Sequence, residues 1–122
     1  MTAANTILIV DDSPTELQVL SAPIKAMGYT VLTAADGDEA IQIATERQPR
    51  LILLDVIMPK KNGFQVCRQL KNTPETSDIK IIIISSKNQE SDKFWGMKQG
   101  ADDYIMKPFD DKMLRAAVAK FM

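Results

Sequence analysis

Hydrophobic residues gather in short continuous runs, and these alternate with longer segments that have helical periodicity. The strongest runs are residues 7–10, 51–54 and 81–84. Strands that are apolar on both faces are covered on both sides, as in parallel sheets flanked by helices. Weaker runs at residues 30–33 and 104–106 suit positions nearer the sheet edges. The alternation predicts repeated strand–helix units around a parallel sheet.

Residues that begin and end helices lie between these runs. Ser13 and Glu16 have the spacing of a capping box, with Pro14 at the first helical position. Other capping residues and helix-ending glycines follow at Asp36, Asn62, Asp110, Gly28 and Gly100. With right-handed crossovers, this predicts an α/β, flavodoxin-like fold. Its doubly wound five-stranded parallel sheet has the strand order 2-1-3-4-5 and carries five helices.

The helical segment near residues 89–100 contains several large apolar residues. Phe94 and Met97 are three residues apart and in line with Ala101, so we expect both to face the sheet. Trp95 is rotated from that direction by about 100°. We therefore expect Trp95 to be exposed or half-exposed.

Composition narrows the functional classes. The chain has 122 residues and a net charge of −1, so no basic field favours binding to nucleic acid or anionic lipid. No apolar run approaches the roughly 20 residues of a membrane span, and no secretion signal is visible. The single cysteine, Cys67, fits a filler role in a reducing cytoplasm. We expect one cytoplasmic domain over residues 1–122, with a core at about 6–121 and no output domain.

The chain contains no histidine. A phosphohistidine, a histidine-ligated zinc site and a Ser-His-Asp triad are therefore excluded. The chemistry must come from carboxylates, hydroxyls and lysine.

Chemically distinctive residues follow four of the predicted strands. Asp11 and Asp12 follow the first, Asp55 the third, Ser85 the fourth and Lys107 the fifth. In open α/β sheets, ligands bind beyond the carboxyl ends of the strands, where the strand order reverses. A lone acidic residue after a strand usually caps a helix, but Ser13 already caps the first one. We therefore expect these five side chains to form one cluster.

Three carboxylates in one cluster favour a bound cation. Like charges about 4 Å apart repel by roughly 1 to 4 kcal/mol, and one lysine offsets only part of this. Oxygen ligands without nitrogen or sulfur favour a hard ion, and room for water favours Mg²⁺. A carboxylate can attack phosphorus to give an acyl phosphate, so Asp55 is the candidate nucleophile.

These residues resemble the receiver domains of two-component response regulators, over residues 7–121. The resemblance rests on the following segments in order: Asp11-Asp12, Asp55-Val56-Ile57-Met58-Pro59 with Gly63, Ser85, Gly100-Ala101-Asp102-Asp103-Tyr104, and Lys107-Pro108-Phe109. It implies a stand-alone signalling switch that catalyses only its own phosphorylation and dephosphorylation. Two further segments, residues 12–17 and 89–100, look like receivers of pilus-driven twitching motility or phototaxis.

The resemblance also implies roles for single residues. Asp55 would be the phosphoacceptor and would hold Mg²⁺ with Asp12 and the Ile57 backbone carbonyl, while Asp11 would act through water. Ser85 and Lys107 would contact phosphoryl oxygens. The switch aromatic that moves inward would be Tyr104, and the Lys107–Pro108 peptide would be cis.

The resemblance implies partners as well. A histidine kinase or a histidine phosphotransfer protein would donate the phosphoryl group. A downstream protein would bind the face built from the helix at 89–100, the strand at 104–106 and the last helix. Trp95 would lie on or beside that face. Neither nucleic-acid binding nor membrane insertion is expected.

Two other functions remain to be compared. A Mg²⁺-dependent phosphoaspartyl hydrolase of the haloacid dehalogenase type should carry its nucleophile in an Asp-x-Asp run after the first strand. Here the nucleophile follows the third strand. A flavodoxin-like redox protein should offer hydroxyls and backbone donors to a flavin phosphate, which Asp11 and Asp12 would repel.

Overall fold

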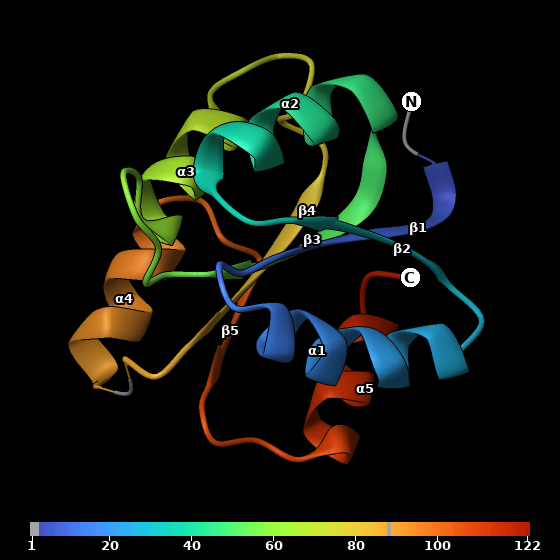
Figure 1. Ribbon diagram of the computed structural model, residues 1–122. Coiled ribbons are helices and arrows are strands. Elements are labelled where there is room, and N and C mark those ends of the chain that lie inside the picture. The colour runs from blue at the N-terminus through green and yellow to red at the C-terminus, as the bar shows by residue number, and fades with distance from the viewer. Residues whose placement is uncertain (1–2, 88) are drawn as a thin grey trace.

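A computed structural model describes residues 3–87 and 89–122 as three layers, with a parallel sheet between two layers of helices (Figure 1). The elements in chain order are β1 (Ala3–Val10), α1 (Pro14–Ala26), β2 (Thr30–Ala34), α2 (Gly37–Arg47), β3 (Pro49–Asp55), α3 (Gly63–Lys71), β4 (Lys80–Ser85), α4 (Glu90–Lys98), β5 (Asp103–Met106) and α5 (Asp111–Ala119). The strand order is β2-β1-β3-β4-β5 and every pairing is parallel. The predicted fold class and order are confirmed, with β2 and β5 at the edges.

Alternate residues of the central strands form two separate cores. Leu8, Ile52 and Ile81 face one side and pack with α2 and α3. Ile7 and Leu51 face the opposite side and pack with α1 and α5. Side chains in a strand alternate between faces, so a continuous apolar run serves both cores. Figure 1 shows α2 and α3 on one side of the sheet and α1 and α5 on the other.

The start of α1 differs in one respect from the predicted capping box. Ser13 is the N-cap, and its Oγ accepts a hydrogen bond from the Glu16 N–H at 3.3 Å. The reciprocal bond does not come from Glu16. Asp11 Oδ1 accepts the Ser13 N–H instead, at 3.0 Å. Ser13 is therefore the cap, as predicted, and Asp11 adds a hydrogen bond to the Ser13 backbone. The Glu16 side chain contacts Lys107 instead of the cap.

The predicted orientation of α4 is also wrong. Phe94 and Met97 are 63% and 41% exposed, and the one buried residue of this helix is Gly96. A Cβ on Gly96 would lie 2.9 Å from Tyr104 Cδ2 and 3.2 Å from Phe64 Cε1. The helix therefore approaches two aromatic rings through a position without a side chain. Hydrophobic spacing could not reveal this, because glycine contributes nothing to an apolar stripe.

Cys67 fills space, as predicted. Its side chain is fully buried, and burial raises the pKa of the thiol to about 12. A thiol needs its thiolate form to act as a nucleophile, so Cys67 is a packing residue, and its Sγ also donates to the Gln99 carbonyl at 3.6 Å. In the described part of the chain, no helix is long and apolar enough to cross a membrane.

Candidate functional site

Three carboxylates meet at the carboxyl ends of β1 and β3. One oxygen each from Asp11, Asp12 and Asp55 lies within 4.8 Å of the others. The parallel pairing of β1 with β3, where Val10 opposes Leu54, brings these strand ends together. Gly63, the first residue of α3, lies so close to the Asp55 backbone that a Cβ there would clash with the Asp55 carbonyl oxygen. The predicted acidic cluster is therefore formed.

The carboxylates differ in exposure. Asp11 and Asp55 are buried, whereas Asp12 is exposed. Asp11 Oδ1 accepts the Ser13 N–H, but Asp11 Oδ2 is buried without a hydrogen-bond partner in the described residues. A buried carboxylate oxygen without a hydrogen-bond partner destabilises the folded state, and a bound cation or water at this atom would remove that cost.

Burial and mutual repulsion shift the acidities of this cluster. Burial, and to a lesser degree the charge of Asp11, raise the pKa of Asp55 from 3.8 to about 6, against the opposing charge of Lys107. Burial also raises the pKa of Asp11, against the hydrogen bond from Ser13 and the charge of Lys107. The deprotonated forms of Asp11 and Asp55 are thus destabilised by their surroundings, and bound positive charge would relieve this.

Lys107 provides one positive charge to three carboxylates. Its Nζ lies 3.8 Å from Asp11 Oδ2, 3.8 Å from Asp55 Oδ1 and 3.6 Å from Glu16 Oε2. The first two partners were expected at this site, but Glu16 was assigned only to the helix cap. Its place in the first turn of α1, directly after the acidic pair, is the signal that could have identified it. The Lys107–Pro108 peptide is cis, as predicted.

Ser85 and Tyr104 are placed at the neighbouring strand ends. Ser85 ends β4, is fully buried, and its Oγ accepts the Lys87 N–H at 3.0 Å. The Tyr104 ring is also buried, and its hydroxyl donates to the Lys87 carbonyl at 2.8 Å. Burial raises the pKa of the Tyr104 hydroxyl. Both residues therefore hold the segment that follows β4.

Ile57 follows the acidic site on the loop after β3. Its side chain is 56% exposed and lines a pocket of about 370 Å³ together with Met58, Lys87 and Trp95. Trp95 is 53% exposed, in agreement with its predicted half-exposed position. It faces α3, however, and is absent from the residues that line the pocket between α4, β5 and α5.

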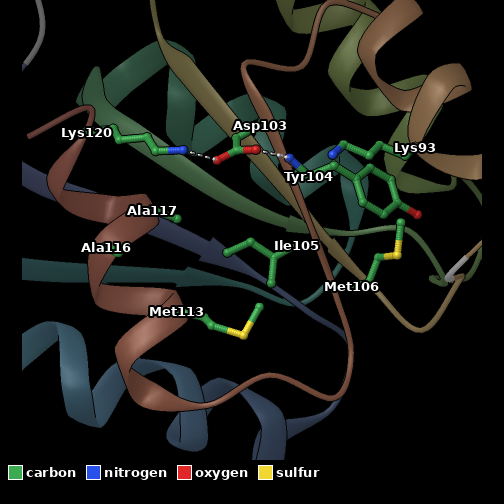
Figure 2. Close-up of a pocket in the computed structure, with 9 residues that line it drawn as sticks. All are labelled: Lys93, Asp103, Tyr104, Ile105, Met106, Met113, Ala116, Ala117 and Lys120. Carbon is green, nitrogen blue, oxygen red and sulfur yellow. Dashed lines mark hydrogen bonds and ion pairs between the residues drawn. The ribbon is translucent and has the colours of Figure 1, made fainter. Parts of the chain in front are cut away.

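That second pocket, also of about 370 Å³, is drawn in Figure 2. Its charged members are Lys93, Asp103 and Lys120, and Lys120 Nζ lies 3.3 Å from Asp103 Oδ2. Figure 2 shows Ile105 below this ion pair and Met113 below Ile105, with Lys93 and Tyr104 on the side of the pocket away from α5. The face expected to bind a partner is therefore hollowed and partly apolar.

The donor set of the acidic cluster fits a hard divalent cation. All ligand candidates are oxygens, and the unsatisfied Asp11 Oδ2 and the raised carboxylate pKa values indicate missing positive charge. Exposed Asp12 leaves one side open to water. These features suit Mg²⁺, which keeps several waters and binds through one or two carboxylates.

Comparison with known proteins gives a consistent result. Residues 7–119 match the family described as the response regulator receiver domain. Protein PilH of Pseudomonas aeruginosa is 48% identical over 108 residues, covering 88% of this chain and 89% of that protein. The probable transcriptional regulator ycf27 of Porphyridium aerugineum is 40% identical over 112 residues, covering 92% of this chain but only 45% of that protein. The solved structure of chemotaxis protein CheY4 of Vibrio cholerae has a TM-score of 0.90 at 29% identity, covering 98% of this chain and all of that one.

Proposed function

This chain belongs to the response regulator receiver domain family, and from that premise we propose that it is a switch operated by phosphorylation of Asp55. One observation carries the proposal. Asp55 lies at the carboxyl end of β3, with Asp11 and Asp12 beside it and Lys107 Nζ 3.8 Å from its Oδ1. The family membership favours this function over the phosphoaspartyl hydrolase and the flavodoxin-like redox protein.

The reaction requires an ionised Asp55. A carboxylate oxygen attacks the phosphorus of a phosphohistidine in a histidine kinase or histidine phosphotransfer protein. The new P–O bond forms as the P–N bond breaks, and the departing imidazole nitrogen takes up a proton. The raised pKa of about 6 leaves Asp55 mostly ionised at neutral pH and keeps the oxygen nucleophilic.

The surrounding residues would hold the transferred group. Asp12, Asp55 and the Ile57 carbonyl would hold Mg²⁺, and Asp11 would act through water. The ion would supply positive charge to the phosphoryl oxygens. Lys107 would pair with one phosphoryl oxygen and exchange its contact with Asp55 for it. The Ser85 hydroxyl would donate to another oxygen.

Signalling would follow from the bonds around Lys87. If Ser85 turns to the phosphoryl group, the Lys87 N–H loses its acceptor. The Lys87 carbonyl is also the acceptor of the Tyr104 hydroxyl, so Tyr104 and the pocket in Figure 2 would respond. We propose that a downstream protein binds this α4–β5–α5 face. The likeness to a chemotaxis protein supports a role in motility or taxis.

Binding of a phosphoryl mimic tests the proposal. Beryllofluoride with Mg²⁺ should shift the backbone amide NMR signals of Ser85, Lys87 and Tyr104. Beryllofluoride alone should not do so, and adding it to the Mg²⁺-bound protein should give no further shift in Asp55→Asn. Asp78→Asn, on the exposed turn that precedes β4, is the matched control and should respond as the wild type. Shifts that persist in Asp55→Asn would overturn the proposal.

A further inference from the structure

A second hollowed surface lies between α3 and α4, and Trp95 lines both of its pockets. One pocket, with Ile57 and Lys87, borders the acidic site. The other runs along the carboxyl ends of both helices, past Arg68 and Lys98. We call Ile57, Arg68, Lys87, Trp95 and Lys98 the α3–α4 surface. None of them lines the pocket of the α4–β5–α5 face.

The packing of α4 holds Trp95 toward this surface. Gly96 lies against the rings of Tyr104 and Phe64, and this contact fixes the rotation of the helix. The neighbouring Trp95 is consequently turned toward α3 and remains 53% exposed. Ile57, 56% exposed, lines the same pocket. Two large apolar side chains thus remain open to solvent, and exposed tryptophan is a frequent anchor of protein interfaces.

The charges around these apolar residues have one sign. Lysine or arginine lines the two pockets at four positions, and no aspartate or glutamate lines either one among the described residues. Lys71 is neutralised by Asp102 at 2.9 Å. No ion pair engages Arg68, Lys87 or Lys98 within the described part of the chain. The surface is locally basic on a chain whose net charge is −1.

We infer that the α3–α4 surface binds an acidic segment of a partner protein that carries large apolar side chains. The apolar side chains would pack on Trp95 and Ile57, and the carboxylates would face Arg68, Lys87 and Lys98. Complementary charge at the rim speeds association and selects the partner, while the buried aromatic anchor supplies most of the affinity.

The position of the surface connects it to the acidic site. Ile57 and Lys87 follow Asp55 and Ser85 by two residues each. The Lys87 backbone also bonds to both Ser85 and Tyr104. Phosphorylation would therefore alter affinity at this surface, a consequence that rests on the proposed function. Binding to the unphosphorylated protein does not depend on it.

The test uses a synthetic amphipathic peptide with leucine and phenylalanine on one face and glutamate on the other. A peptide with lysine in place of glutamate is the matched probe. Amide NMR shifts of the unphosphorylated wild type and of Asp55→Asn should map the acidic peptide to the α3–α4 surface. Using Asp55→Asn separates this test from phosphorylation, so failure here would leave the proposed function standing.

Variants make the result specific. Trp95→Ala should lower the affinity for the acidic peptide about tenfold or more, as loss of an aromatic anchor does. The double variant Arg68→Glu/Lys98→Glu replaces exposed residues and should keep the fold; it should weaken binding about tenfold. Lys112→Glu, exposed on α5, should leave binding unchanged.

Four outcomes would overturn the inference. The lysine peptide could bind as tightly as the glutamate peptide, or the shifts could centre on the α4–β5–α5 face. A single-stranded oligonucleotide could bind the surface more tightly than the acidic peptide. Concentration-dependent shifts at Trp95 without any peptide would show that a second copy of the chain occupies it.

Discussion

Lys107 Nζ lies 3.8 Å from Asp55 Oδ1, and the same ammonium also approaches Asp11 and Glu16. A single cation thus holds together carboxylates from the ends of β1 and β3 and from α1. Its contact with Asp55 is long for a hydrogen bond, so the ammonium is held by charge and can change partners.

Lys107→Ala should destabilise the metal-free protein. Asp11, Asp55 and Glu16 would lose the charge that offsets their repulsion, at a cost of about 1 to 2 kcal/mol of unfolding free energy. Urea unfolding in the presence of a chelator measures this, with Lys112→Ala on the surface of α5 as the control. Equal stability of Lys107→Ala and the wild type would show that the ion pairs contribute nothing.

The pKa of Asp55 predicts a dependence of stability on pH without metal. The folded-state pKa of about 6 is above the ordinary 3.8, so the folded state binds the proton more tightly than the unfolded state. Stability from this group is therefore complete below about pH 4 and falls as pH rises through about 6, by at most about 3 kcal/mol. Asp55→Asn should remove that fall.

Comparing the wild type with Asp55→Asn isolates the contribution of the Asp55 carboxyl to the pH dependence of stability. In a chelator at pH 7, Asp55→Asn should have the higher unfolding free energy, and the difference should shrink toward pH 4. Chemical denaturation at several pH values measures both curves. A difference that grows as pH falls would mean that ionised Asp55 stabilises the fold, contrary to the geometry.

Asp12→Ala should weaken Mg²⁺ binding at least about tenfold, because a proposed direct ligand is lost. The metal-free protein should be equally or more stable, since Asp12 is exposed and one source of repulsion is removed. Calorimetric Mg²⁺ titration and urea unfolding measure the two effects. Asp78→Ala, on an exposed turn, is the control. A marked loss of metal-free stability would assign Asp12 a structural role instead.

Tyr104→Phe tests the link from the acidic site to Trp95. The change removes the hydroxyl that donates to the Lys87 carbonyl but keeps the ring over Gly96. Stability should fall by about 1 kcal/mol. Trp95 is the only tryptophan, so indole fluorescence reports on its pocket with Lys87. Fluorescence should respond to beryllofluoride with Mg²⁺, and Tyr104→Phe should reduce that response.

Tyr29→Phe is the matched control, since Tyr29 packs in the core on the opposite face of the sheet. It should leave the fluorescence response intact. A wild-type signal that ignores beryllofluoride would contradict the link, as would a full response in Tyr104→Phe.

The sheet could be predicted because its central strands are continuous apolar runs. Residues 7–10, 51–54 and 81–84 all fall inside observed strands. The acidic cluster followed from the strand order alone, since Asp11, Asp12 and Asp55 belong to strand ends that must be neighbours. Both predictions depend on backbone topology, which hydrophobic patterning determines strongly.

Side-chain direction could not be predicted where packing depends on a missing side chain or on competing partners. Gly96 rotates α4 so that Phe94 is exposed, although the spacing of Phe94 favours burial. Glu16 fits the capping spacing, yet it approaches Lys107, and Asp11 takes the hydrogen bond that Glu16 would have made. The rotation of α4 and the partner of Glu16 depend on residues far away in the sequence, which a local sequence pattern does not include.

Locating the acyl phosphate tests the central claim most directly. The protein is incubated with acetyl phosphate with or without Mg²⁺, the acyl phosphate is reduced with borohydride, and the peptides are sequenced by mass spectrometry. We predict modification at Asp55 alone, dependent on Mg²⁺ and absent from Asp55→Asn. Modification elsewhere at a similar rate, or phosphorylation that persists in Asp55→Asn, would contradict the account.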